Sequence, residues 1–311
     1  MKPAKRVLLT GASGFVGRHT IQELQARDFE IHAVGRHPLT NPSVNLLQHT
    51  VDLADDDLVR RMIREVAPTH LMHLAWDVTP GAFWSSSTNL DWVATSLRLY
   101  RAFVEHGGRR AIFAGTFAEY DWTNELLDEE TTPLRPATLY GTAKCALHNL
   151  IAQSAESEGI STAWGRLFML YGPHERAARL VPSVACALLQ GEQALCGDGI
   201  AARDFMHVAD AGRALAIILD SDHRGAINVA SGTCTPVRDV IATIADLTGR
   251  HDLVRFGARP TPPGEPLRLA GSTRLLHHQL GFAPHFNLTD GLADTVRWWR
   301  LQLSQSASAR R

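Results

Sequence analysis

Three side chains in the middle of the chain, Thr116, Tyr140 and Lys144, could act together on a carbonyl group. Tyr140 and Lys144 are four residues apart, so on a helix they share one face. A phenol with its usual pKa of about 10 is a poor acid at neutral pH, but a cation beside it stabilises the phenolate and lowers that pKa. The Thr116 hydroxyl can hydrogen-bond the same carbonyl oxygen. These residues predict proton transfer to a carbonyl oxygen opposite a hydride source, with an ordinary surface pair of Tyr and Lys as the alternative.

A glycine-rich stretch at the head of the chain could hold that hydride source. Val7 to Thr10 has the pattern of a buried strand, glycines follow at every third position, and the run from His19 to Leu24 suits a helix. The free N–H groups at the start of such a helix face an anion, most simply the pyrophosphate of a dinucleotide. A tight turn that binds nothing is the alternative. The residues predicted to contact the cofactor here are Gly11, Ser13, Gly14, Phe15, Val16 and Gly17.

The end of the second predicted strand indicates which dinucleotide binds. An acidic residue just after this strand would hold the ribose hydroxyls of NAD. Arg36 stands there instead, with Arg18 and His37 nearby. A guanidinium matches a 2′-phosphate in charge and geometry, so we predict NADP(H) as the cofactor, with NAD as the alternative. Asp52, at the end of the third predicted strand, could reach the adenine amino group.

Strands and helices alternate along the first half of the chain. The predicted strands cover residues 7–10, 29–35, 46–51, 69–75 and 111–114, and helices follow at 19–24, 55–66, 89–106 and 140–156. This alternation predicts an α/β fold with a Rossmann-like, doubly wound parallel sheet whose ligands bind at the carboxyl ends of the strands.

The predicted domains follow from this alternation. We expect a dinucleotide-binding domain at residues 1–170, with 204–231 packing back on it. A smaller C-terminal α/β substrate domain would comprise 171–203 and 232–303, and residues 304–311 would form a frayed tail.

The composition is that of an ordinary globular protein. Of the 311 residues, 45% are hydrophobic and 20% charged, and the formal net charge is -1. We expect neither nucleic acid nor membrane as a partner, because there is no basic surplus and no apolar run of about 20 residues. The first strand follows the N-terminus without a signal-peptide core, which predicts a cytoplasmic protein. The 4 cysteines lack CxxC spacing and the 15 histidines are scattered, so no metal site is predicted.

Taken together, these motifs resemble the extended short-chain dehydrogenase/reductase family, which contains NAD(P)-dependent sugar epimerases, dehydratases and ketoreductases. The matching segments span nearly the whole chain: TGASGFVG at 10–17, Asp52-Leu53, HLAW at 73–76, Thr116 four before Tyr120, YGTAK at 140–144, RLFMLYGP at 166–173 and RDFMHVAD at 203–210.

The resemblance also implies roles and partners. It implies Tyr140 as the acid/base, Lys144 as its partner and Thr116 as the hydroxyl helper, with a nucleotide sugar as substrate. It places Leu53, Leu74, Ala75 and Trp76 beside the cofactor. It further implies a homodimer formed through the helices at about 89–106 and 140–156.

The predicted substrate domain contains fewer candidate binding residues. Val181, near the start of a predicted helix through Leu189, is expected to line the nucleotide site, as the equivalent helix does in similar enzymes. Arg203 matches the family arginine that meets the substrate pyrophosphate, with a salt bridge to Asp204 as the alternative role. Arg259 and Arg268 are further phosphate candidates in and next to an irregular loop at 259–266, and a last helix is predicted from Leu288 to Trp299.

Departures from the family pattern narrow the choice among the family's reactions. Sugar 4,6-dehydratases of the family carry an acidic pair directly after the threonine, where this chain has Phe117 and Ala118. Many epimerases and dehydratases also carry Asn where this chain has Met169. Epimerases retain NAD, whereas Arg36 favours a dissociable NADPH. We therefore expect an NADPH-dependent 4-ketoreductase acting on a nucleotide-linked 4-keto-6-deoxyhexose. The alternatives are an NAD-dependent 4-epimerase and a non-catalytic NADP-sensing binding protein.

Overall fold

The computed structural model describes residues 5–39, 46–260 and 266–308. Most of the irregular loop predicted at 259–266, and the last three residues of the predicted tail, lie outside these ranges.

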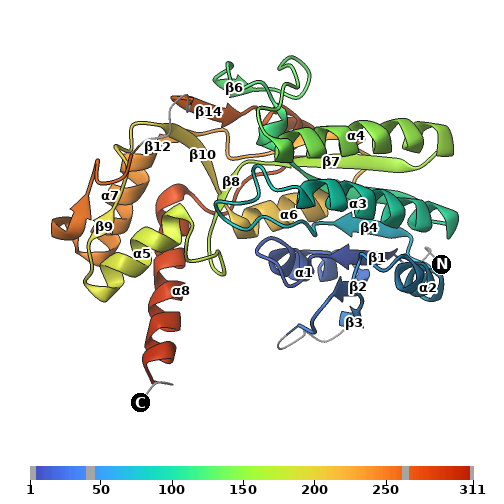
Figure 1. Ribbon diagram of the computed structural model, residues 1–311, viewed down its shortest axis with the longest axis horizontal. Helices are drawn as coiled ribbons and strands as arrows, with labels where there is room; N and C mark the ends of the chain where they lie inside the picture. Colours follow the sequence, from blue (N-terminus) through green and yellow to red (C-terminus); the bar gives the residue numbers. More distant parts are fainter. Residues whose placement is uncertain (1–4, 40–45, 261–265, 309–311) are drawn as a thin grey trace.

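A seven-stranded sheet forms the larger lobe, with strand order β11-β7-β5-β4-β1-β2-β3 (Figure 1). All six strand pairs are parallel, with Val7 of β1, for example, opposite both Ile31 of β2 and His70 of β4. The strands are β1 (Lys5–Thr10), β2 (Phe29–Gly35), β3 (Leu46–Thr50), β4 (His70–His73), β5 (Arg110–Thr116), β7 (Ser161–Leu167) and β11 (Gly225–Val229). This confirms the predicted doubly wound sheet. Its order reverses between β1 and β4, the place where such sheets bind their ligands.

Helices cover both faces of this sheet. The helices of the larger lobe are α1 (Gly17–Gln25), α2 (Asp56–Val66), α3 (Thr88–Glu105), α4 (Leu139–Glu158) and α6 (Val208–Leu219). α1 and α6 share one apolar core with the sheet, and α2, α3 and α4 share the other. α6 and β11 thus belong to the larger lobe although they come late in the sequence.

Local sequence explains where the key helices begin. At α2 the Asp55 carboxylate accepts a hydrogen bond from Leu58 N (3.0 Å), and Asp56 and Asp57 lie in the first turn, where carboxylates favour the helix dipole. At α4 the Thr138 hydroxyl accepts from Gly141 N (3.1 Å). This cap fixes the start of α4 immediately before Tyr140.

The smaller lobe is built on α5 (Leu180–Gln190), α7 (Val237–Thr248) and α8 (Leu288–Ser308), which share an apolar core of their own (Figure 1). Its strands are β6 (Leu126–Leu127), β8 (Met169–Tyr171), β9 (Ala194–Leu195), β10 (Ala202–His207), β12 (Cys234–Pro236), β13 (Val254–Arg255) and β14 (Arg268–Gly271). β10 lies between β12 and β14 and also pairs with β8, so one small sheet contains residues of both predicted domains. Short helical turns complete the fold: η1 (Phe117–Glu119), η2 (His251–Leu253) and η3 (Arg274–Gln279).

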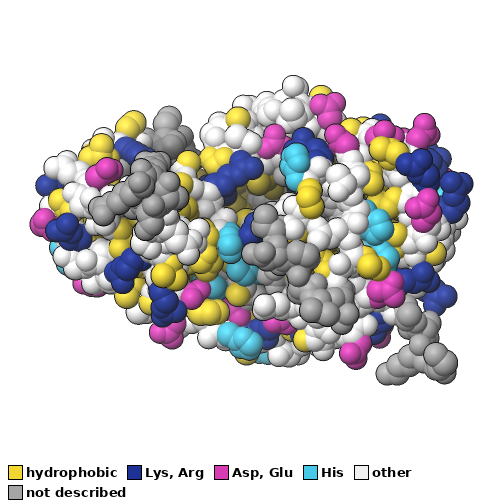
Figure 2. Space-filling view, turned by 90° about the horizontal axis from the view of Figure 1, so that it is seen from below, with side chains coloured by type: hydrophobic (Ala, Val, Ile, Leu, Met, Phe, Trp, Pro, Cys, Tyr) yellow, Lys and Arg dark blue, Asp and Glu magenta, His cyan; other side chains and the backbone are white. Residues whose placement is uncertain are grey.

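The end of the chain differs from its prediction. The last helix does not stop near Trp299, and residues 304–308 continue α8 rather than fraying. The Leu, Gln and Ala residues beyond Trp299 favour a helix, and no Gly or Pro interrupts them. Within the described residues, no helix is long and apolar enough to cross a bilayer. On the face shown in Figure 2, positive and negative side chains are interspersed over both lobes.

Candidate active site

The glycine turn between β1 and α1 is closed tightly on itself. Gly11 has φ of 73°, and a Cβ at this residue would lie 2.8 Å from the main-chain nitrogen of Ala75 at the end of β4. A Cβ at Gly17 would overlap the carbonyl oxygen of Gly11. Only glycine therefore fits at either position. The turn keeps the start of α1 close to the carboxyl ends of β1 and β4, which is the cradle that a dinucleotide pyrophosphate requires.

Arg18 has a different place from the one predicted. We expected it near Arg36, at the end of β2. Its Nη2 instead donates to the carbonyl oxygen of Ser13 (2.6 Å), and its Nη1 lies 3.0 Å from His174 Nδ1. Because α1 directs this side chain back over the turn, Arg18 ties the glycine turn to the loop that follows β8.

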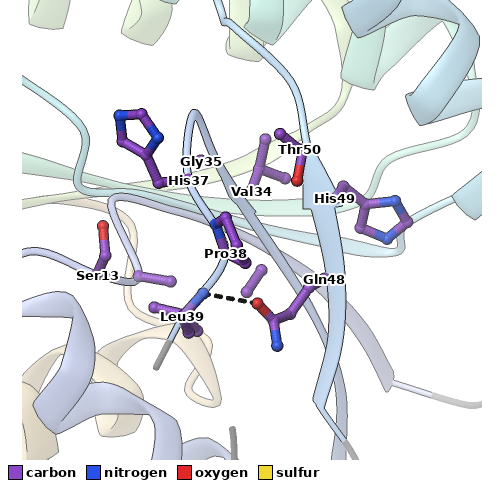
Figure 3. Close-up of a pocket in the computed structure, with 11 residues that line it drawn as sticks. Ser13, Val34, Gly35, His37, Pro38, Leu39, Gln48, His49 and Thr50 are labelled. Atoms are coloured by element: carbon purple, nitrogen blue, oxygen red, sulfur yellow. Dashed lines mark hydrogen bonds between the residues drawn. The ribbon is translucent and has the colours of Figure 1, made fainter. Parts of the chain in front are cut away.

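A small pocket lies at the end of β2, between the glycine turn and β3 (Figure 3). Its lining includes Ser13, Gly35, His37 and Thr50, and Leu39 N donates to Gln48 Oε1 (2.7 Å) beside it. This position fits the adenosine end of a dinucleotide. The Arg36 side chain is exposed and does not line this pocket.

The remaining predicted cofactor residues lie along the same edge of the sheet. Asp52 is exposed, and its carboxylate accepts from Ala54 N (3.0 Å), while Leu53 is buried under α2. Phe15 and Val16 are half-buried in the turn, and Leu74 and Ala75 follow β4, where Ala75 N contacts the Thr10 hydroxyl at 3.3 Å.

The structure brings Thr116, Tyr140 and Lys144 together at the carboxyl end of β5. Thr116 is the last residue of β5, and Tyr140 and Lys144 project from the first turns of α4. All three are buried. Burial raises the pKa of the Tyr140 phenol, and its side-chain hydrogen bond with Thr116 partly offsets that rise. The group is arranged so that the phenol keeps its proton at neutral pH.

Lys144 lies against a main-chain carbonyl and an aromatic ring. Its ammonium donates to the carbonyl oxygen of Ala114 (2.8 Å) and lies 3.7 Å from the centroid of the Trp76 ring. Burial lowers the pKa of Lys144 to about 7, so a large part of its charge is lost near neutral pH. Burial is therefore the largest influence on the pKa of both Tyr140 and Lys144, and the predicted effect of Lys144 on the Tyr140 pKa stays a prediction. Trp76, predicted beside the cofactor, is held by a hydrogen bond from its Nε1 to Asn89 (2.9 Å).

A buried polar network that the sequence analysis missed supports Thr116. The fully buried Glu119 accepts from Thr116 N (2.9 Å) and from Trp164 Nε1 (2.9 Å), and it forms an ion pair with Arg166 (2.8 Å). Arg166 also donates to the Tyr120 hydroxyl (2.9 Å). The spacing of Thr116 and Glu119 is that of a capping box, and this spacing is the sequence pattern that could have predicted the bond between them.

The predicted substrate residues are less accessible. Val181 is 2% exposed and packs in the core of α5, α7 and α8, so its side chain supports α5 rather than lining an open surface. Arg203 is 4% exposed in β10, and its Nη1 donates to the carbonyl oxygen of Ala202 (2.8 Å). Asp204, its suggested partner, accepts instead from the main chain of Ser231, Gly232 and Gly271. Arg268 is exposed and lies 3.5 Å from Glu125.

Known proteins share this architecture. A model of the NAD dependent epimerase/dehydratase family matches residues 7–230. A UDP-glucose 4-epimerase of Azospirillum brasilense is 27% identical over 336 residues, which cover 97% of this chain and 93% of that protein. A dTDP-glucose 4,6-dehydratase of Mycolicibacterium smegmatis is 25% identical, over 95% of this chain and 93% of that protein. The crystal structure of a Thermus thermophilus UDP-glucose 4-epimerase in complex with NAD is 27% identical, with a TM-score of 0.81 over 95% of this chain and 99% of that one.

Proposed function

Because the chain belongs to the NAD dependent epimerase/dehydratase family, within the extended short-chain dehydrogenase/reductases, we propose that it uses NADPH to reduce a nucleotide-diphosphate 4-keto-6-deoxyhexose. The product is the corresponding 6-deoxy sugar nucleotide. The observation that carries this proposal is the absence of an acid–base pair next to Thr116. Phe117 and Ala118 follow it, and the nearest carboxylate, Glu119, is bound to Arg166, Trp164 and the main chain. Elimination of water has no free acid and base at these positions.

Each residue of the site has a separate role in the proposed reduction. Thr116 and Tyr140 hold the carbonyl oxygen of the substrate, and Tyr140 donates its phenolic proton to that oxygen. Tyr140 carries this proton at neutral pH, because burial raises the pKa of its phenol. When bound, the nicotinamide would supply the hydride for this reduction. The glycine turn would hold the pyrophosphate, and Lys144 would hold the nicotinamide ribose.

Arg36 supports NADPH over NADH within this proposal. It directly follows β2, at the place where an acidic residue would hold the ribose of NAD, and its exposed side chain can turn toward a 2′-phosphate. Ser13 and His37 line the neighbouring pocket and are further candidates to donate hydrogen bonds to that phosphate. Arg203 remains the proposed contact of the substrate diphosphate.

The test is oxidation of NADPH, followed by its absorbance, with 4-keto-6-deoxyhexoses carried on dTDP, GDP, CDP and UDP. Consumption with one of them identifies the reductase and its nucleotide. If NADPH binds tightly and none of the four is reduced, the proposal is wrong.

The same assay tests the role of Tyr140. We predict that Tyr140→Phe lowers turnover by about 10²-fold or more, because general acid catalysis is worth about 10² to 10⁴. NADPH affinity should change little, since the phenol acts on the substrate oxygen. Turnover within threefold of the wild type would contradict the assignment.

A second candidate is 4-epimerisation with retained NAD. It is favoured by the likeness to the Azospirillum epimerase over 97% of this chain. Purified protein that carries stoichiometric nicotinamide fluorescence and interconverts UDP-glucose and UDP-galactose would establish it over the reductase.

A further inference from the structure

Three half-buried aromatic side chains, Trp84, Phe117 and Trp122, lie next to Tyr140; we call them the aromatic wall. The rings of Phe117 and Trp122 are stacked with centroids 5.6 Å apart, and Trp84 meets the Trp122 ring edge to face at 6.3 Å. The Trp84 ring in turn lies 5.8 Å from the Tyr140 ring. The wall is therefore continuous, and one end of it contacts the proposed proton donor.

Main-chain contacts fix the aromatic wall relative to the reacting groups. Tyr140 N donates to the carbonyl oxygen of Trp84 (3.1 Å), and Trp122 Nε1 donates to the carbonyl oxygen of Phe117 (3.2 Å). Phe117 directly follows Thr116 in the sequence. Since Phe117 has no polar side-chain atom and the N–H of Trp122 is already bonded, these two rings present carbon to whatever lies against them.

This surface favours some sugar substituents over others. A methyl group or the C–H face of a sugar ring gains about 25 cal/mol for each Å² of apolar surface that the rings remove from water. A hydroxyl or carboxylate against the same rings loses its hydration without gaining a hydrogen bond, which is unfavourable. The aromatic wall therefore discriminates between substituents on the carbon atoms near the reacting carbonyl.

We propose that the aromatic wall determines substrate specificity by selecting a sugar nucleotide with a methyl group at C5 over the same sugar with a hydroxymethyl group there. This inference rests on the proposed function, because it takes the sugar carbonyl to lie between Thr116 and Tyr140. C5 is adjacent to C4, so the C5 substituent lies within reach of rings that contact Tyr140.

The experiment is calorimetric titration of the NADPH-saturated protein with two ligands that differ by one hydroxyl group, dTDP-D-fucose and dTDP-D-galactose. The same pair on UDP is titrated in parallel. We expect the wild type to bind the 6-deoxy sugar about tenfold more tightly or better, within the range of about 10- to 200-fold that an apolar pocket achieves for one small group.

Variants locate the source of this preference. Phe117→Ala and Trp122→Leu should each bring the affinity ratio close to one, because each removes a ring of the wall. Phe256→Ala is the matched control: this ring is 43% exposed and packs against Arg238 in the smaller lobe, so the ratio should stay at the wild-type value.

The outcomes separate the two proposals. Equal affinities for the two sugars in the wild type, or a preference that survives both wall substitutions, overturns the inference while leaving a nucleotide-sugar enzyme. If neither nucleotide pair binds, the inference is overturned, and the NADPH oxidation assay with all four nucleotides still decides the proposed function. The wild-type comparison decides even if a wall variant does not fold.

Discussion

Glu175 is a buried carboxyl group in the loop after β8, and only 7% of it is exposed. Its Oε2 has no hydrogen-bond partner among the described residues, and its nearest cation, Arg179, lies 3.9 Å from Oε1. Burial raises the pKa of this carboxyl to about 8, and Arg179 opposes the rise. The group is therefore mostly a neutral acid at pH 7.

This pKa has a consequence for stability. The folded state holds the proton more tightly than the unfolded state, whose carboxyl titrates near 4.5. Glu175 therefore lowers the free energy of unfolding progressively as the pH rises from about 4.5 to about 8. We predict that Glu175→Gln makes the protein more stable at pH 8 than the wild type, and by much less at pH 5. The gain has an upper limit of about 5 kcal/mol, since each pKa unit is worth about 1.4 kcal/mol.

Urea unfolding at pH 5 and pH 8 measures this difference. Glu125→Gln serves as the control, because its side chain is 73% exposed, and it should shift neither curve. A Glu175→Gln protein whose stability differs from the wild type equally at both pH values would show that burial of the acid is not the cause.

At the scale of elements, the junction of β1 and α1 sets the geometry of the cofactor site. The main chains of Gly11 and Gly17 are in contact, and they leave no room for a side chain at Gly17. We predict that Gly17→Ala separates the turn from α1, lowers NADPH affinity by tenfold or more, and destabilises the fold by about 1 to 3 kcal/mol, as overpacking usually does.

Gly249→Ala is the control. Gly249 has φ of 67° at the C-terminal end of α7 in the smaller lobe, and a Cβ there would meet nothing within 4 Å, so the substitution strains the main chain but leaves the glycine turn intact. Fluorescence titration with NADPH measures the affinities, and urea unfolding measures the stabilities. If the two variants bind NADPH equally well, the close approach at Gly17 does not control cofactor binding.

The elements also show what the sequence could and could not predict. Strand-to-helix alternation, glycine spacing and the Tyr140–Lys144 pair identified the sheet and the candidate cluster of Thr116, Tyr140 and Lys144, because each depends on local chemistry. The network of Glu119 with Trp164 and Arg166 joins residues 45 and 47 positions apart, so the capping-box spacing points to Glu119 but not to these two distant partners. The burial of Val181 and Lys144 was not predicted for the same reason: Val181 packs against α7 and α8, and Lys144 lies against Trp76, contacts that only the folded chain creates.

At the scale of the whole molecule, α3 and α4 lie side by side on one face of the large sheet (Figure 1). Leu90 on α3 and Leu150 on α4 are 59% and 53% exposed, although both are large apolar residues. A second copy of the chain could cover them with the same two helices, burying an isologous interface. We therefore expect a homodimer through this face.

A charge introduced on α4 tests this dimer. Light scattering should give twice the monomer mass of 34.1 kDa for the wild type and the monomer mass for Leu150→Glu, because a buried, unpaired carboxylate strongly opposes association. Leu301→Glu is the control, since Leu301 is 54% exposed on α8, away from this face, and it should remain dimeric. A wild-type protein that is monomeric at micromolar concentration contradicts the prediction. A dimer that survives Leu150→Glu and is lost in Leu301→Glu would move the interface to α8, in the smaller lobe.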